Sequence, residues 1–356
     1  MAPLREFRCG AFALLALAAA IAPARSEEVR IGIGFGLAFL PTYICEDLKL
    51  VEKHGKEAHL DLKASYRRFP GAGPLQDAIA SGEIDMGPFG TAPLLGQWER
   101  AQSAHRQILA VSGITTLPLA LLTNRASAHT LSDLQPSDRI ALPTASAPQL
   151  YLLEMQSEKV FGQYDRLREQ IVVLSPSDAV AALLSGNGPS AYFSSAPYTQ
   201  IALEDGRVHK LLTSGDVIGG KSSFLIMGAT RAYVTAHPKI PEVVEKAIEE
   251  AARIIRDDPR HAAQIYLMHE PSKTLDTAAV EAVVSEIKDE FGGAIYGVDA
   301  FSAFMGRHGE LKSPPHSWKE IVAPALLNSP SSGCLSASAD SMRACYDERS
   351  LTVCRS

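Results

Sequence analysis

The chain has 356 residues, of which 46% are hydrophobic and 21% charged, and its formal net charge is −6. That length is enough for two domains, each with its own buried core. The composition excludes a wholly disordered chain and a small disulfide scaffold. An acidic balance without any long basic run excludes nucleic-acid binding driven by counterion release.

Residues 1–24 have the pattern of a secretory signal peptide. Arg5 and Arg8 give a basic start, 10–22 is apolar, and 22–24 reads Ala-Pro-Ala, a cleavage site of small residues. The apolar run is shorter than the roughly 20 residues that a membrane-spanning helix needs. We therefore expect the mature protein to be exported and to work outside the cytoplasm.

The cysteines that remain after such cleavage fall into two groups. Cys45 lies in an apolar helical segment and is predicted to be an inert core thiol. Cys334, Cys345 and Cys354 lie in a serine-containing tail, 328–356, which we predict to be a loosely ordered appendage. Whether one disulfide closes that tail is left open by the sequence.

From residue 28 onward, short apolar runs alternate with segments of helical periodicity. The pattern predicts strands at 29–33, 60–66, 84–86, 108–114, 119–123, 139–142, 171–174, 190–193, 208–212 and 223–228. Helices are predicted at 41–53, 75–81, 92–101, 147–160, 177–185 and 196–204, and then at 241–257, 259–269, 274–290 and 299–308. This alternation is typical of an α/β fold with mostly parallel sheets, followed here by a helical C-terminal part.

Two extended apolar segments, 114–124 and 223–231, divide the chain. If both cross between two lobes, the first lobe is 27–116 plus 226–327 and the second is 117–225. We then expect a ligand in the cleft between the lobes, because pockets form preferentially at such boundaries.

One short feature occurs three times, each time after a predicted strand and at the start of a predicted helix. It reads Thr-Ala-Pro at 91–93 and Ser-Ala-Pro at 146–148 and at 195–197. Helix capping alone explains any single copy, since Ser or Thr is a preferred N-cap and Pro fits the first turn. Their shared position adds a second interpretation, because loops at strand carboxyl ends line the ligand crevice and helix N-termini favour anions.

The loops at these strand ends contain no charged residue. They are 34–40, 88–93, 114–118, 143–148 and 192–198, and they carry aromatic and hydroxyl side chains. A cationic ligand would need a carboxylate, so the loops predict a neutral or anionic ligand with an apolar body. The nearby charged residues Arg67, Arg68, His269 and Glu270 are predicted to be solvated.

Two motifs resemble nucleotide-binding loops without the context that the chemistry needs. Residues 215–222 match G-x-x-x-x-G-K-[ST], but a strand rather than a helix is predicted after Lys221-Ser222, which favours a plain turn. The glycines at 32, 34 and 36 lack the spacing of a dinucleotide loop. No catalytic or metal-ligand constellation assembles, so we expect neither an enzyme nor a cofactor.

Several short stretches occur in a characteristic order: 69–87, 90–93, 131–134, 178–186, 196–198, 237–238 and 309–318. In that order they resemble the periplasmic substrate-binding proteins of the nitrate/sulfonate/taurine class of ABC importers. The resemblance implies a two-lobed periplasmic binding protein fold of type II, which closes by a hinge and docks on a membrane permease. We expect a monomer in the periplasm.

Positions that line the pocket in this class correspond here to Phe35, Phe39, Thr91, Thr115, Thr116, Ser146, Ala147, Ser195 and Tyr198. Members of the class often carry an acidic residue where Thr91 stands, and Trp-Asp where Ser195-Ala196 stands, so no relative's substrate is carried over. The main hypothesis is a carrier for a small organic anion, such as a sulfonate, nitrate or a taurine-like compound. One alternative keeps the fold and stacks a neutral heteroaromatic, such as a pyrimidine vitamin precursor, on Phe35, Phe39 or Tyr198. A sensor that delivers its ligand to a receptor stays open as well.

Overall fold

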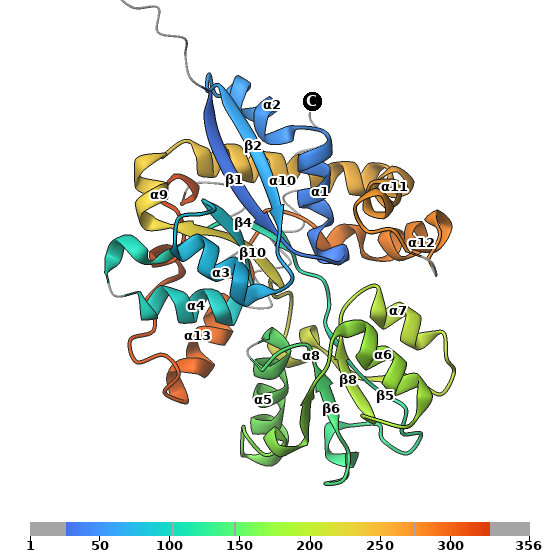
Figure 1. The fold of residues 1–356 in the computed structure, drawn as a ribbon. Helices are drawn as coiled ribbons and strands as arrows, with labels where there is room; N and C mark the ends of the chain where they lie inside the picture. Colours follow the sequence, from blue (N-terminus) through green and yellow to red (C-terminus); the bar gives the residue numbers. More distant parts are fainter. Residues whose placement is uncertain (1–25, 102, 146, 273–274, 328–356) are drawn as a thin grey trace, which may run out of the picture.

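The computed structural model describes residues 26–101, 103–145, 147–272 and 275–327. These residues form two bodies, each built around a five-stranded sheet with helices on its faces (Figure 1). We call the body around the first sheet the first lobe and the other the second lobe. The predicted signal peptide, the predicted tail with Cys334, Cys345 and Cys354, and Ser146 lie outside the described residues.

The first sheet has the strand order β2-β1-β3-β10-β4. Its strands are β1 (Glu27–Ile33), β2 (Leu62–Arg68), β3 (Met86–Phe89), β4 (Ile108–Thr115) and β10 (Leu225–Thr230). β1 runs parallel to β2 and β3, whereas β10 runs antiparallel to β3 and β4.

The second sheet repeats this arrangement with the order β7-β6-β8-β5-β9. Its strands are β5 (Ala120–Thr123), β6 (Ile140–Leu142), β7 (Ile171–Val173), β8 (Ala191–Ser194) and β9 (His209–Thr213). β6 is parallel to β7 and β8, and β5 is antiparallel to β8 and β9.

Both sheets are mostly parallel, as expected, but each contains one antiparallel strand. In each sheet the antiparallel strand is the one that arrives from the other lobe, β10 in the first and β5 in the second. Such a strand enters the sheet at the end where the parallel strands finish. It must therefore run in the opposite direction to them. Hydrophobic alternation in the sequence carries no information on strand direction.

Helices of the first lobe come from both ends of the chain. They are α1 (Leu40–Asp47), α2 (Leu50–Glu57), α3 (Ala72–Ala80), α4 (Thr91–Arg100), α9 (Arg231–Ala236), α10 (Ile240–Asp257), α11 (Pro259–His269), α12 (Thr277–Ile287) and α13 (Val298–Arg307). The helix predicted at 41–53 is two helices, because Lys49 has a left-handed backbone with φ of 52°. The free Cys45 is buried in α1 as predicted, and burial raises the pKa of its thiol.

The second lobe has four helices in its described residues. They are α5 (Pro148–Phe161), α6 (Pro176–Ser185), α7 (Tyr198–Leu203) and α8 (Ser214–Ile218). Seven short 3₁₀ helices complete the described part of the chain: η1 (Leu37–Phe39), η2 (Ala104–Arg106), η3 (Leu131–Asp133), η4 (Arg168–Gln170), η5 (Lys288–Glu290), η6 (Trp318–Glu320) and η7 (Pro324–Leu326). The turn expected at 215–222 is only partly right, since α8 covers its first residues; no helix starts at Lys221, however, and β10 follows.

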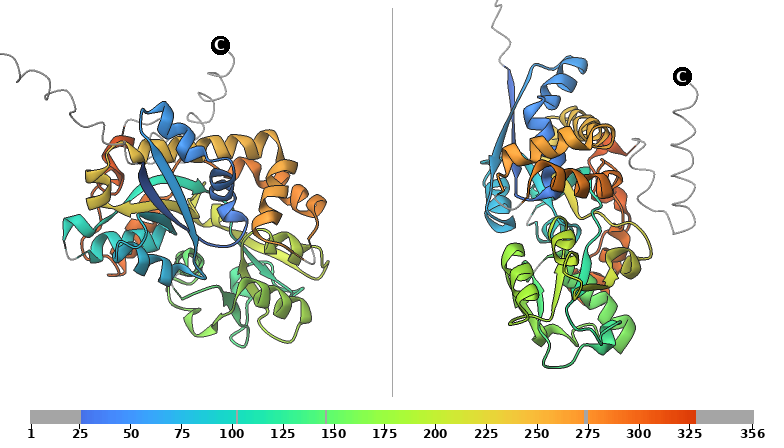
Figure 2. Two further views of the ribbon diagram at one scale, coloured as in Figure 1. Left: turned by 45° about the horizontal axis from the view of Figure 1, so that its top comes forward. Right: turned by 90° about the vertical axis from the view of Figure 1, so that its right-hand side faces the viewer.

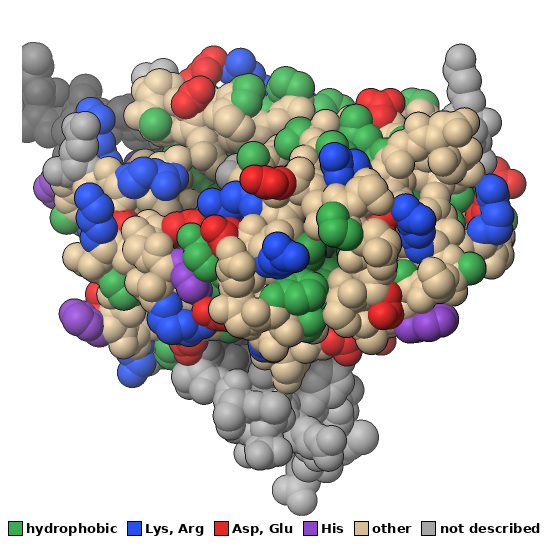
Figure 3. Space-filling view, turned by 90° about the horizontal axis from the view of Figure 1, so that it is seen from below, with side chains coloured by type: hydrophobic (Ala, Val, Ile, Leu, Met, Phe, Trp, Pro, Cys, Tyr) green, Lys and Arg blue, Asp and Glu red, His purple; other side chains and the backbone are tan. Residues whose placement is uncertain are grey.

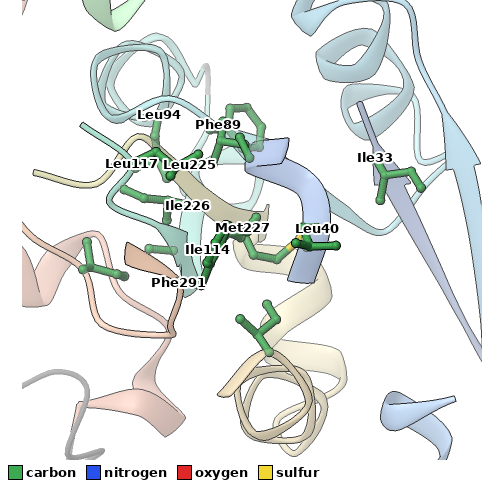
Figure 4. Packing of buried hydrophobic residues seen from close by; sticks show 14 of the residues in the cluster. Ile33, Leu40, Phe89, Leu94, Ile114, Leu117, Leu225, Ile226, Met227 and Phe291 are labelled. Carbon is green, nitrogen blue, oxygen red and sulfur yellow. The ribbon is translucent and has the colours of Figure 1, made fainter. Parts of the chain in front are cut away.

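Apolar packing continues from the first lobe into the segments that connect the lobes. Figure 4 shows Leu117 beside Leu225 and Ile114 beside Phe291, with Ile226 between the two pairs. The two connections also bond to each other, since the Phe224 amide donates to the Thr115 carbonyl at 2.9 Å. Burial of these side chains stabilises the crossing point by roughly 25 cal/mol for each Å² of apolar surface.

The lobes also meet beside the connections, where α5 packs against α13. The rings of Tyr151 and Phe301 lie 6.4 Å apart, and Arg307 donates to the carboxylate of Glu158 at 2.9 Å. The two further views in Figure 2 show the lobes and the segments that join them. No helix in the described ranges has the length and apolarity that crossing a bilayer requires.

Candidate functional site

The first turns of α4 and α5 meet at the inter-lobe boundary. A Cβ placed on Gly90 would lie 2.7 Å from Cγ of Pro148, so the two helix starts touch. Their N-caps are Gly90 and Ala147, and neither has a polar side chain that could accept the first-turn N–H groups. Helix N-termini with such donors attract anions.

In the two described copies of the repeated feature, the hydroxyls of Thr91 and Ser195 do not cap their helices as expected. Thr91 is the first residue of α4 rather than its N-cap, and its buried Oγ1 donates to the Ser223 carbonyl at 2.7 Å. Ser195 precedes α7, whose N-cap is Pro197. Thr91 instead bonds α4 to the segment that returns from the second lobe. This hydrogen bond satisfies the hydroxyl, which is buried.

Thr115 and Thr116 lie where the first connection leaves β4. Both hydroxyls donate to the Glu290 carbonyl, at 2.9 and 3.3 Å, and that of Thr116 also lies 2.5 Å from the Glu290 carboxylate. Their hydroxyl hydrogens are thus used within the protein. These two predicted ligand contacts therefore hold the connection to the segment after α12.

The two predicted aromatics of the loop after β1 differ in their surroundings. Phe35 is 55% exposed, whereas the ring of Phe39 packs so closely on Gly34 that a Cβ there would lie 2.4 Å from Cζ. A side chain at position 34 would therefore force the Phe39 ring to move. Phe35 is the ring available to an incoming molecule.

Tyr198 opens α7 on the side of the second lobe that faces α11 and α12 (Figure 1). Its side chain is half-buried, and burial followed by the negative charge of Glu270 raises the pKa of its phenol. On the same face, Gln200 donates to Glu286 of α12 at 3.4 Å. Tyr198 thus lies within electrostatic reach of a carboxylate from the other lobe.

Glu270 was missed as a site residue by the sequence reasoning. One carboxylate oxygen, Oε1, accepts the Gly36 amide at 2.5 Å and the Tyr43 hydroxyl at 2.5 Å, and Oε2 lies 3.4 Å from the Tyr266 hydroxyl. The prediction that this helix end is simply solvated is wrong. No local sequence pattern could predict this contact, because Gly36 and Glu270 are 234 positions apart.

The neighbours of Glu270 are also more enclosed than predicted. The His269 ring stacks on Tyr43 with centroids 4.7 Å apart and bonds to Asp47 at 2.9 Å. Arg68 lies over the Tyr43 ring and pairs with Glu46 at 3.7 Å. Arg67, by contrast, is 54% exposed, as predicted, and pairs with the similarly exposed Glu83. Burial, and next the hydrogen bond to Glu270, raise the pKa of Tyr43.

The boundary thus offers helix amides, the phenol of Tyr198 and the carboxylates of Glu286 and Glu290, and the Phe35 ring is exposed. Among the described residues no cluster of His, Cys, Asp and Glu has the arrangement of a metal site. On the face in Figure 3, acidic and basic side chains are interspersed, without the large basic area that a nucleic-acid surface needs. The arrangement suits binding of a small polar molecule.

Solved structures with the same fold were found, although no protein-family model and no curated protein matches the sequence. The aliphatic sulphonate binding protein SsuA of Escherichia coli has a TM-score of 0.63 at 20% identity, covering 83% of this chain and 92% of its own. SsuA of Xanthomonas axonopodis, an alkanesulfonate-binding protein, has 0.62 at 22% identity, covering 86% and 99%. The nitrate-binding protein NrtA of Synechocystis has 0.62 at 13% identity, covering 89% and 91%. The chain therefore has the two-lobed fold of the periplasmic binding proteins.

Proposed function

We propose that this protein is the solute-binding component of an ABC importer and takes up a small organic anion at the inter-lobe boundary. The observation that carries the proposal is the meeting of two helix N-termini, from α4 and α5, with Gly90 in contact with Pro148. The amides that these first turns can offer are those of Thr91 and Ala92 in α4 and of Gln149 in α5, since Pro93 and Pro148 have no N–H and the Leu150 amide donates to the Ala147 carbonyl. That arrangement suits an oxyanion.

The fold comparison supports the same ligand class. The solved structures of this fold named above are described as binding sulfonates or nitrate, and all of these are anions. They are also binding proteins, so a carrier is a better proposal than an enzyme. The heteroaromatic alternative has no comparable support.

The proposed role in transport depends on closure. Two connections, 116–119 and 219–224, join lobes of the same strand order, so a hinge there brings the lobes together on the ligand. The closed form would then dock on the permease in the periplasm. Phe35, Ala147, Ser195 and Tyr198 are the predicted residues that we assign to the ligand face, whereas the buried Thr91 hydroxyl donates to the Ser223 carbonyl.

Thermal unfolding of the purified mature chain tests the proposal. A ligand present at 100 times its Kd stabilises the folded state by about 2.7 kcal/mol, which raises Tm by several degrees. We expect that rise with at least one of an alkanesulfonate, a carboxylate or nitrate, and none with an alkylammonium chloride of the same size. If none of these anions raises Tm at millimolar concentration, the anion carrier is refuted.

A further inference from the structure

Apart from the connections, the two lobes are joined where α5 of the second lobe packs on α13 of the first. The Tyr151 ring meets the buried Phe301 ring edge-on, with centroids 6.4 Å apart. Tyr164, which follows α5, contacts Phe304 and His308, with centroids 6.1 and 4.0 Å apart. The aromatic contact therefore runs along α13 from Phe301 to His308.

Two polar bonds cross the boundary at the C-terminal end of α13. The Glu158 carboxylate of α5 accepts from the Arg307 guanidinium at 2.9 Å and lies 2.8 Å from Nε2 of His308. Burial opposes the ionisation of Glu158, but the hydrogen bonds with Arg307 and His308 outweigh it and hold the pKa of its carboxyl below the usual value. One charged carboxylate of the second lobe thus has two partners from the first.

The other charged groups beside this contact have partners of their own. Arg168 pairs with Glu154 at 2.5 Å, and both belong to the second lobe. Burial, and next a hydrogen bond to Glu310, raise the pKa of the Tyr151 hydroxyl. Because Glu310 follows α13, this hydrogen bond also crosses the boundary between the lobes.

The N-terminal end of α13 lies at the second connection between the lobes. A Cβ placed on Gly297, the N-cap of α13, would lie 2.8 Å from Cβ of Ser222, and the Tyr296 amide donates to the Ser223 hydroxyl at 3.0 Å. Since a helix rises about 1.5 Å per residue, Arg307 lies about 14 Å further along α13. The helix is therefore anchored beside the hinge at one end and bonded to the second lobe at the other.

This geometry makes the Glu158 bonds sensitive to the angle between the lobes. A rotation of roughly 15° about an axis through the connection displaces a point about 14 Å away by about 4 Å, which is more than a hydrogen bond tolerates. The lobes also touch where Gly90 meets Pro148 and where Gln200 donates to Glu286. The structure is therefore a closed arrangement, and opening it requires that the Glu158 bonds break.

We infer that α13 is a latch arm, which holds the lobes closed through the bonds of Arg307 and His308 to Glu158. The latch sets the balance between the open and closed forms, and a ligand that binds the closed form binds more tightly when that form is more populated. All three side chains are partly exposed, so their bonds stabilise the closed form only modestly and the lobes can reopen. The inference concerns lobe movement and does not depend on which ligand binds.

Small-angle X-ray scattering of the mature chain without added ligand tests the latch. Glu158→Lys places a cation against Arg307, so we expect the lobes to separate and the radius of gyration to rise by at least about 0.5 Å from a value of roughly 20 Å. Arg307→Glu places a second carboxylate against Glu158 and should have the same effect. The double variant E158K/R307E restores an ion pair, so its radius of gyration should return towards that of the wild type.

Glu242→Lys is the matched control, because it makes the same charge change beside Lys246 on α10, within the first lobe. It should leave the radius of gyration unchanged. Circular dichroism checks that each variant keeps the helix content of the wild type, so that a larger radius reports lobe separation rather than unfolding. An unchanged radius in both single variants overturns the latch, and so does a double variant as expanded as the single ones. If Glu158→Lys does not fold, Arg307→Glu gives the same test at a side chain that is 58% exposed.

Discussion

The Thr116 hydroxyl donates to the Glu290 carboxylate at 2.5 Å, and this bond ties the first connection between the lobes to the segment after α12. The same carboxylate lies 3.1 Å from the Lys221 ammonium on the second connection. Glu290 therefore holds both connections at the point where they cross. Lobe movement must bend the chain next to this residue.

Replacing Glu290 by Ala should destabilise the protein, because it removes a charged hydrogen bond and an ion pair from the crossing point. We expect the free energy of unfolding to fall by about 1–2 kcal/mol in urea denaturation. Glu286→Ala, at an exposed position of α12, is the matched control. It should change the free energy of unfolding by less than about 0.5 kcal/mol. Equal stability of the two variants would show that Glu290 does not secure the connections.

Gly90 is the position where a single methyl group should disturb the boundary between the lobes. In Gly90→Ala the new Cβ would overlap Pro148, so α4 and α5 must move apart; overpacking of this kind costs about 1–3 kcal/mol. We expect at least tenfold weaker binding of the ligand found in the thermal screen, measured by calorimetry. Gly206→Ala is the control, since a Cβ there meets nothing within 4 Å, and unchanged binding in both variants would place the ligand elsewhere.

Phe35 should contribute to binding without contributing to stability. Its ring is 55% exposed, so Phe35→Ala should leave the free energy of unfolding within about 0.5 kcal/mol of the wild type. Loss of the apolar contact should weaken ligand binding about tenfold, or about 1.4 kcal/mol. Phe161→Ala removes another exposed ring, at the far end of α5, and should not change the affinity. If Phe161→Ala weakened ligand binding more than Phe35→Ala, our assignment of Phe35 to the ligand face would be wrong.

Asp138 should make the second lobe sensitive to acid. Burial opposes its ionisation, but hydrogen bonds from the Gln135 amide at 2.7 Å, Ser190 at 2.8 Å and Arg125 at 2.6 Å outweigh burial and hold its pKa below the usual value. A lowered pKa stabilises the fold above the unfolded value of about 3.9, and this contribution is lost as the pH falls through the folded value.

Asp138→Asn should therefore lower the free energy of unfolding by about 2 kcal/mol at pH 7, and by progressively less below about pH 4. Urea denaturation at pH 7, 5, 4 and 3 measures the difference in the free energy of unfolding between the wild type and Asp138→Asn. The exposed Asp61→Asn serves as the control. A difference that stays constant from pH 7 to pH 3 would rule out the ionised carboxylate as its source.

Most helices and strands followed from local pattern, and the exceptions have local causes. The periodicity of 41–53 is continuous, yet Lys49 takes a left-handed backbone and splits it into α1 and α2. The short helices α8 and α9 were not predicted, since five or six residues carry too little periodicity. The antiparallel direction of β5 and β10 was not predicted, because it depends on the end of the sheet at which the chain enters.

The sequence by itself indicated two domains with buried cores, most of the order of the elements and the absence of charge from the loops at the strand ends. It could not determine the charge of the site, because Glu270 reaches Gly36 from 234 positions away. Nor could it distinguish hydroxyls available to a ligand from those, such as Thr91 and Thr116, that bond the returning chain. Hydrophobic periodicity is a local property, whereas the balance of charge and hydrogen bonds at a boundary depends on which distant segments the fold brings together.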